Sequence, residues 1–181
     1  MAKVLIVVGS PRVGGNSQIM ADALEGGAKA AGNEVRQINV GRAKISGCIA
    51  CESCFVNGGK CAIDDDMQPL YGDMEWADVI VYAFPLYFYS YPAQIKAFMD
   101  RQFCAAGGRS GIMGKKIALL MPYEDAHAER ADGLVKSFEI AMDYCKQEII
   151  GMVLCNGVYE KGAIEGNEAL ERCRALGASI S

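Results

Sequence analysis

Residues 3–17 read KVLIVVGSPRVGGNS, an apolar run that leads into a glycine-rich polar segment. The run Lys3–Val8 is almost continuously apolar, which is typical of a strand buried on both faces of a parallel sheet. The polar segment is followed by Asn16–Ala31, where apolar residues recur at helical spacing. A buried strand, a glycine-rich turn and a helix in this order predict the first βα unit of an α/β domain.

Strand and helix patterns continue to alternate along the chain. The further expected strands are Glu34–Val40, Asp78–Phe84, Lys116–Met121 and Glu148–Cys155. The further expected helices are Met67–Trp76, Pro92–Phe103, His127–Lys146 and Asn167–Ala178. This alternation predicts an α/β, flavodoxin-like three-layer sandwich, in which a five-stranded parallel sheet of order 2-1-3-4-5 carries helices on both faces. We expect one domain over residues 1–181, with a cysteine-rich insertion loop at about 45–66.

Composition excludes several classes of protein. The chain has 181 residues, 51% of them hydrophobic, and a net charge of −4. It therefore lacks the basic surface that nucleic-acid binding requires. No apolar run approaches the roughly 20 residues of a membrane span, and the first ten residues do not resemble a signal peptide. We expect a cytoplasmic protein that binds neither nucleic acid nor membrane.

The segment Gly9–Ser17 lies where backbone amides and the dipole of the following helix favour an anion. It lacks the Lys-Ser/Thr pair of a Walker A loop, and a proline interrupts the glycine pattern of a dinucleotide-binding turn. Its hydroxyl, amide and guanidinium groups suit a terminal phosphate monoester. The plainer interpretation is a glycine turn in which Asn16 or Ser17 caps the helix. The polar side chains concerned are Ser10, Arg12, Asn16 and Ser17.

The segment Phe84–Tyr91 is unusually aromatic. Five of its eight residues are Phe or Tyr, whereas the composition of the chain predicts about 0.7. They follow a buried strand and so emerge at the ligand edge of the sheet. They fit a planar heteroaromatic ligand, although aromatic residues also cover cores and subunit interfaces. A phosphate at one loop and a flat ring at the other describe FMN.

These two motifs, GSPRVGGNS at 9–17 and FPLYFYSYPAQIKAFMDR at 84–101, resemble the NAD(P)H-dependent FMN reductase-like proteins of the flavodoxin superfamily. The resemblance implies FMN as cofactor and NAD(P)H as substrate. It implies that the phosphate lies against Ser10, Arg12, Asn16, Ser17 and the backbone of Gln18. It implies that the isoalloxazine lies against Pro85, Leu86, Tyr87 and Phe88, with Tyr123 and Glu124 in a third, less similar loop.

Four of the eight cysteines fall within residues 48–61, with the spacing C-x2-C-x2-C-x6-C. Zinc ribbons pair two separate C-x2-C knuckles, whereas three cysteines at successive x2 intervals resemble ferredoxin-type ligation. The motif is similar to that of the iron–sulfur flavoproteins. That resemblance implies a [4Fe–4S] cluster on Cys48, Cys51, Cys54 and Cys61, exchanging electrons with FMN across a subunit interface. Bound zinc, free thiols and partial disulfides are the alternatives.

The cysteine loop is expected at the same sheet edge as the two flavin loops. Residues 64–66, three aspartates that follow the loop, are interpreted as an exposed acidic run at the start of a helix. The scattered cysteines, which are Cys104, Cys145, Cys155 and Cys173, are expected to be buried apolar residues. Trp76 is expected in the core.

The two loops, together with the family resemblance, predict an FMN-dependent NAD(P)H oxidoreductase that passes electrons to a quinone, a small acceptor or the cluster. No catalytic side chain is singled out, because hydride transfer to flavin needs no protein acid. The alternatives are a non-enzymatic FMN/[4Fe–4S] electron carrier between protein partners such as ferredoxin, and a zinc-binding module on the same fold. By family resemblance we expect a homodimer or homotetramer.

Overall fold

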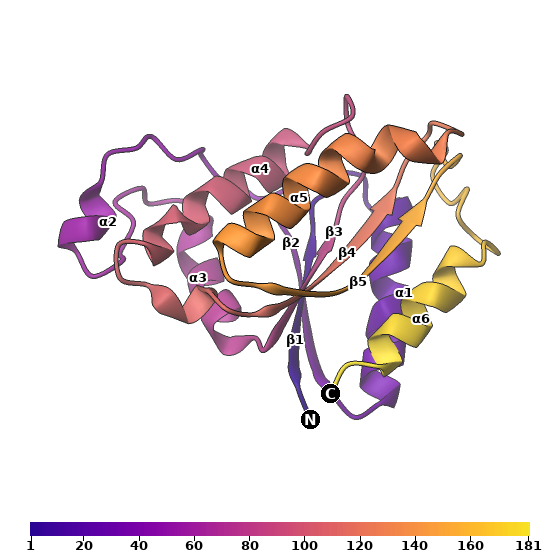
Figure 1. Cartoon of the computed structure of the whole chain (residues 1–181), viewed down its shortest axis with the longest axis horizontal. Coiled ribbons are helices and arrows are strands. Elements are labelled where there is room, and N and C mark those ends of the chain that lie inside the picture. Colours follow the sequence, from indigo (N-terminus) through magenta and orange to yellow (C-terminus); the bar gives the residue numbers. More distant parts are fainter.

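The computed structural model describes all 181 residues and contains one five-stranded parallel sheet of order β2-β1-β3-β4-β5 (Figure 1). The strands are β1 (Lys3–Val8), β2 (Glu34–Asn39), β3 (Val79–Ala83), β4 (Lys116–Pro122) and β5 (Glu148–Cys155). The predicted strand order and all five predicted strands are confirmed, with boundaries that move by at most one residue.

Helices cover both faces of the sheet, so the predicted three-layer sandwich is confirmed (Figure 1). The α-helices are α1 (Asn16–Ala30), α2 (Ser53–Val56), α3 (Met67–Trp76), α4 (Ala93–Asp100), α5 (Asp132–Tyr144) and α6 (Ala169–Ala178). Helices α1 and α6 pack on one face, and α3, α4 and α5 pack on the other. None of the helices has the length and apolar character needed to cross a membrane.

The strands are buried on both sides because each contributes alternate residues to two hydrophobic cores. In β1, Val4 and Ile6 pack with α1 and α6. Leu5 and Val7 pack with α3, α4 and α5. This explains why the strands read as continuous apolar runs in the sequence.

Helices α1 and α6 approach each other closely through two glycines. A Cβ atom added to Gly27 would lie 2.9 Å from the backbone carbon of Arg174, and one added to Gly177 would lie 2.9 Å from the amide nitrogen of Ala28. Neither position has room for a side chain. Glycine at position 27, although unfavourable for helix formation, is therefore required for the close packing of α1 on α6.

Several helix ends differ from the sequence prediction. The helix expected over 92–103 ends at Asp100 and continues as a 3-10 helix (Arg101–Ala105). The carbonyl of Arg101 accepts a hydrogen bond of 3.1 Å from the Tyr71 hydroxyl, a partner that the sequence pattern does not show. The helix expected from His127 begins as a 3-10 turn (Ala128–Ala131) before α5.

Trp76 lies at the edge of the core and is only partly buried, so its expected burial is wrong in degree. The guanidinium of Arg36 covers its ring, with Cζ 4.0 Å from the ring centroid. An arginine can cover an aromatic face while its charge stays in water.

Candidate functional site

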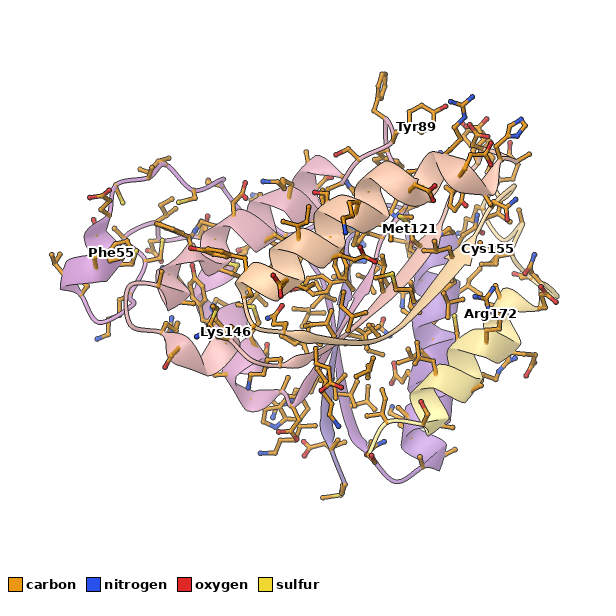
Figure 2. The ribbon with its side chains drawn as sticks, in the orientation of Figure 1. Phe55, Tyr89, Met121, Lys146, Cys155 and Arg172 are labelled. Atoms are coloured by element: carbon orange, nitrogen blue, oxygen red, sulfur yellow. The ribbon has the colours of Figure 1, made fainter.

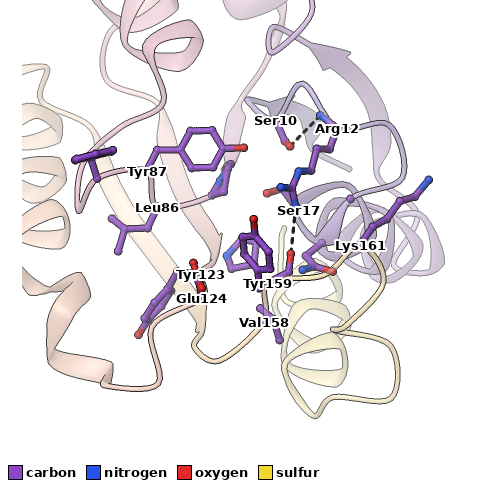
Figure 3. Close-up of a pocket in the computed structure, with 15 residues that line it drawn as sticks. Ser10, Arg12, Ser17, Leu86, Tyr87, Tyr123, Glu124, Val158, Tyr159 and Lys161 are labelled. Atoms are coloured by element: carbon purple, nitrogen blue, oxygen red, sulfur yellow. Dashed lines mark hydrogen bonds between the residues drawn. The ribbon is translucent and has the colours of Figure 1, made fainter.

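A pocket of about 310 Å³ lies between the loops that follow the strands (Figure 3). Its size is at the lower end of the range for small-molecule sites. Nine of the ten residues that the sequence assigned to the cofactor line it, and these are Ser10, Arg12, Asn16, Ser17, Pro85, Leu86, Tyr87, Phe88 and Tyr123. Glu124 also lines the pocket, whereas Gln18 does not. The loops at 9–17, 84–91 and 122–127 therefore meet in space.

One end of the pocket is built to receive an anion. Helix α1 begins at Asn16, so the backbone amides of residues 16–18 have no acceptor within the helix. The N-cap is Gly15 and no side chain caps the helix, so the expected cap by Asn16 or Ser17 is wrong. Ser10 and Ser17 are buried and line the same pocket, and the Ser10 hydroxyl accepts a hydrogen bond from the Arg12 amide at 3.3 Å. Uncapped amides, buried hydroxyls and the positive end of a helix dipole fit a phosphate group.

The side chains of Asn16 and Gln18 form hydrogen bonds within the protein at this end of the pocket. The Asn16 amide donates to the Glu160 carbonyl at 3.0 Å and accepts from the Gly162 amide at 3.1 Å. It thereby fixes the loop after β5 against the start of α1. The Gln18 side chain points away to Asp22, at 2.8 Å. Only its backbone, as the sequence analysis expected, remains available to a ligand.

Two basic side chains line the pocket, Arg12 and Lys161. The Arg12 Nη1 donates to the Tyr159 carbonyl at 3.2 Å, and its guanidinium lies 5.4 Å from the centroid of the Tyr159 ring. Figure 3 shows Arg12, Ser17 and Lys161 on one side of the pocket and Leu86 and Tyr87 on the other. Positive charge is therefore gathered at the end that carries the helix terminus.

The opposite end is formed by a tight hairpin at the start of the aromatic loop. Tyr87 and Ser90 exchange both backbone hydrogen bonds, at 3.0 and 2.9 Å. The two residues between them, Phe88 and Tyr89, have φ angles of +49° and +57°. Left-handed backbone in two consecutive bulky residues is costly, and such strain is concentrated at functional sites. The Phe88 side chain on this hairpin is fully exposed. Tyr89, near the top of the view in Figure 2, is partly exposed, and its hydroxyl donates to Asp125 Oδ2 at 3.1 Å.

Tyr123 lines the pocket but its hydroxyl is already used. The ring is 4% exposed, and the hydroxyl donates to the Ala128 carbonyl at 3.1 Å. Burial raises the pKa of this phenol above its usual value. Tyr123 therefore offers an apolar ring face to the pocket, and it stays protonated at neutral pH.

Sequence reasoning missed the loop between β5 and α6. Val158, Tyr159 and Lys161 from this loop line the pocket. A signal was present, because this loop follows the carboxyl end of a strand in a parallel sheet, where ligands bind. Glycines 157, 162 and 166 within it, all with positive φ, mark it as a loop of defined shape.

The cysteine loop leaves the carboxyl end of β2 but carries its cysteines away from the pocket. None of the four cysteines lines it, and the loop with α2 extends to the far left in Figure 1. The loop therefore starts at the expected sheet edge, but its cysteines do not share the pocket with the two flavin loops of the same chain. The loop instead packs on the segment after α4, where the rings of Phe55 and Phe103 meet at 5.6 Å. A Cβ atom on Gly107 would lie 2.7 Å from the backbone of Cys54, so the two segments touch through backbone.

The four cysteines of the motif line one narrow recess of about 20 Å³, together with Arg101, Phe103 and Cys104. Their thiols are not grouped closely enough to form a metal site as they stand. A group bound by all four would therefore require the loop to widen the recess. The donor set itself, four thiols in one recess, is that of iron–sulfur and zinc sites held by four cysteines.

Among the cysteines, Cys51 has a thiol pKa below its usual value, mainly because of hydrogen bonds with Ser53, with a smaller contribution from the charge of Arg101. Burial raises the pKa of Cys104. Of the four scattered cysteines, Cys104, Cys155 and Cys173 are buried as expected, and Cys145 is only partly buried. Of these thiols, that of Cys51 is therefore the best suited to act as a ligand.

An ion pair closes the base of the cysteine loop. Arg101 Nη1 donates to Asp65 Oδ2 at 2.7 Å and to the Ser46 carbonyl at 3.0 Å, and Nη2 donates to the Ile63 carbonyl at 3.1 Å. Asp65 also accepts from the amides of Ser46 and Met67. Although its burial acts in the opposite direction, these hydrogen bonds hold the pKa of the Asp65 carboxyl below its usual value. The interpretation of residues 64–66 as an exposed acidic run is therefore wrong for Asp65.

The sheet order and the pocket at its carboxyl edge place the protein among the flavodoxin-like proteins. The chain belongs to the NADPH-dependent FMN reductase family, whose profile matches residues 2–147. A protein named iron–sulfur flavoprotein from Methanosarcina thermophila is 31% identical over 169 residues, which cover 93% of this chain and 85% of that protein. The family and this relative confirm the family resemblance drawn from the two motifs and the cysteine spacing.

Solved structures of the same fold have lower sequence identity. An azoreductase from Bacillus anthracis superposes with a TM-score of 0.72 at 18% identity, covering 99% of this chain and 100% of that one. An NAD(P)H:quinone oxidoreductase from Methanothermobacter marburgensis superposes with a TM-score of 0.70 at 18% identity, covering 98% and 96%. At this identity the two structures show the fold alone.

Proposed function

We propose that this protein is an FMN-dependent oxidoreductase that takes electrons from NAD(P)H and passes them to a quinone, another small acceptor or an iron–sulfur cluster. The observation that carries the proposal is the pocket that joins an uncapped helix terminus to an aromatic loop. Membership of the FMN reductase family supports it. FMN has a phosphate monoester at one end and a flat ring at the other, so its two ends match the two ends of the pocket.

When bound, FMN supplies the hydride and single-electron chemistry that no side chain here provides. The residues of the chain bind and orient it. Ser10, Ser17 and the first amides of α1 donate hydrogen bonds to the phosphate. Leu86 and Tyr87 exclude water from the ring face. Asn16 holds the loop after β5 in place, so that Tyr159 and Lys161 close the phosphate end.

The aromatic hairpin at the ring end of the pocket is exposed, which supports the prediction of a homodimer or homotetramer. Phe88 is fully exposed and Tyr89 is 57% exposed, on a strained hairpin. Exposed aromatic residues of this kind are typical of interfaces. A second copy of the chain placed over this hairpin would exclude water from the ring.

We also propose a [4Fe–4S] cluster on Cys48, Cys51, Cys54 and Cys61. The four thiols share one recess, and the chain has a relative named iron–sulfur flavoprotein. Because no cysteine lies at the pocket of the same chain, electron exchange between the two groups fits a path through a neighbouring subunit, as the family resemblance implies.

The test for the flavin is titration of apoprotein with FMN and with riboflavin, followed by steady-state oxidation of NADH and NADPH with a quinone. We expect Ser17→Ala to weaken FMN binding by about tenfold, since one hydrogen bond to a charged group is lost, and to leave riboflavin binding unchanged. Ser179→Ala, on an exposed serine at the end of α6, is the matched control. A chain that binds no FMN at excess cofactor would refute the proposal.

The electron carrier between protein partners is the second candidate, and it is favoured by the cysteine recess that lies apart from the pocket. A carrier would accept electrons from reduced ferredoxin and would not oxidise NAD(P)H. Iron, acid-labile sulfide and zinc measured on one anaerobic sample separate a cluster from a zinc-binding module.

A further inference from the structure

Arg101 is the only charged residue that is buried in this chain. Its side chain has no exposed surface, and it lies in the recess lined by the four cysteines of the motif. A buried guanidinium requires partners for its donors, because an unpaired buried donor is costly. The partners of Arg101 therefore show what this residue does.

The two terminal nitrogens of Arg101 have acceptors, but its third nitrogen has none. Nη1 and Nη2 bind Asp65 and the carbonyls of Ser46 and Ile63, at 2.7 to 3.1 Å. Nε is buried and has no hydrogen-bond partner. These contacts fix the two ends of the cysteine loop, and they leave one N–H group of a fixed cation without an acceptor.

The residues that line the recess offer few acceptors other than sulfur. Outside that lining, the Tyr71 hydroxyl lies near the Arg101 side chain and donates to the Arg101 carbonyl at 3.1 Å. Among the twelve lining residues, the side chains that could accept a hydrogen bond are those of the cysteines and of Glu52, which is exposed. The remaining side chains, apart from Arg101 itself, are aliphatic or aromatic. The recess thus holds an unused cationic donor together with the four thiols of the motif and the thiol of Cys104.

We propose that Arg101 donates a hydrogen bond from Nε to a sulfur of the cluster held by Cys48, Cys51, Cys54 and Cys61, and so raises the reduction potential of that cluster. The inference rests on the cluster proposed above. Reduction adds negative charge to the cluster, and hydrogen bonds to its sulfurs stabilise the added charge. Because Asp65 balances the charge of Arg101, the directional hydrogen bond accounts for most of the effect.

The test compares the wild type with Arg101→Lys and with Arg109→Lys, each reconstituted anaerobically with iron and sulfide. Lysine keeps the charge at position 101 but has no Nε–H group in the same place. Arg109 is the matched control, because its Nε already binds Glu75 Oε1 at 2.6 Å and the residue does not line the recess. The measurements are iron and sulfide per chain and the midpoint potential of a reductive titration.

We expect Arg101→Lys to make the reduction equilibrium at least tenfold less favourable, which is about 59 mV for a one-electron couple, and Arg109→Lys to leave it unchanged. An Arg101→Lys protein with full iron content and the wild-type potential would overturn the inference. A wild-type protein that binds FMN but no iron would refute the cluster, and this inference with it, without affecting the flavin proposal.

A second measurement covers the case in which Arg101→Lys does not hold the cluster. Wild-type protein whose arginines carry nitrogen-15 is reduced and examined by pulsed electron paramagnetic resonance. We expect a nitrogen-15 coupling from one arginine to the reduced cluster, because Arg101 is the only arginine in the recess. No coupling from any arginine nitrogen would overturn the inference.

Discussion

Gly41 contacts the backbone of the phosphate end of the pocket but does not line the pocket. Replacing Gly41 therefore tests the site without changing any residue that would touch the cofactor. A Cβ atom at this position would lie 2.8 Å from the Pro11 nitrogen and closer still to the carbonyl of Ser10. The φ angle of Gly41 is not in the left-handed region, so alanine can adopt the same backbone conformation. Any effect of Gly41→Ala therefore comes from the contact of the added Cβ with the Ser10–Pro11 backbone. Gly41→Ala therefore has to displace the Ser10–Pro11 backbone, and with it the Ser10 hydroxyl.

The expected size of the effect follows from the hydrogen bonds that this shift breaks. One hydrogen bond to a charged phosphate contributes about 1.5–3 kcal/mol, and each step of about 1.4 kcal/mol is tenfold in Kd. We expect the Kd of FMN to rise about 10- to 100-fold in Gly41→Ala, while the Kd of riboflavin, which has no phosphate, stays within about threefold. Flavin fluorescence during titration of the apoprotein measures both.

Gly47→Ala is the matched control, because no atom lies within 4 Å of its added Cβ and its backbone is not left-handed. Equal FMN affinity in the two variants, with equal melting temperatures, would refute the reasoning. An equal loss of FMN and riboflavin affinity in Gly41→Ala would show that the phosphate is not what the Ser10 segment binds.

Three further predictions concern stability and the pocket. Gly27→Ala should destabilise the fold by about 1–3 kcal/mol through overpacking against α6. Gly26→Ala, which has open space around the added Cβ, should stabilise α1 by up to about 1 kcal/mol. Urea unfolding measures both stabilities, and an equal change in the two variants would contradict the close contact between α1 and α6. Asp65→Asn should lower the free energy of unfolding by about 3 kcal/mol at pH 7, because it leaves Arg101 as an uncompensated buried charge. Since the folded pKa of Asp65 is lowered, the difference in stability between wild type and variant should shrink as pH falls below about 4. A stability difference that is constant from pH 7 to pH 3 would exclude the ion pair as its cause. Asn16→Ala should free the loop after β5 and weaken FMN binding about tenfold, and limited proteolysis within residues 157–166 should become faster in that variant alone.

The strands were predictable because their signal is local. A strand buried on both faces, such as β1, needs a continuous apolar run, and this run is visible without knowing its neighbours. Helix ends were less predictable, because distant groups decide them. The change from α4 to a 3-10 helix at Arg101 coincides with a hydrogen bond from Tyr71, thirty positions earlier in the chain.

The same distinction applies to the site. The loops at 9–17 and 84–91 have unusual compositions, so they could be assigned to a phosphate and a ring from the sequence. The loop at 157–162 has glycines but no chemical signature, and only its position after β5 places it at the pocket. The ion pair between Asp65 and Arg101 joins residues 36 positions apart and has no periodic signal. The place of the cysteines could not be inferred either, because it depends on how a long loop packs on the segment after α4.

The close packing of α1 on α6 has a consequence for how the protein is made. The phosphate end of the pocket combines residues 9–17, near the beginning of the chain, with residues 158–161, close to its end. A nascent chain that has been translated only as far as β4 has the helix terminus and the aromatic loop, but Tyr159 and Lys161 are still missing. Stable loading with FMN therefore follows translation of the last βα unit, and ribosome-bound chains arrested before residue 158 should release the cofactor readily.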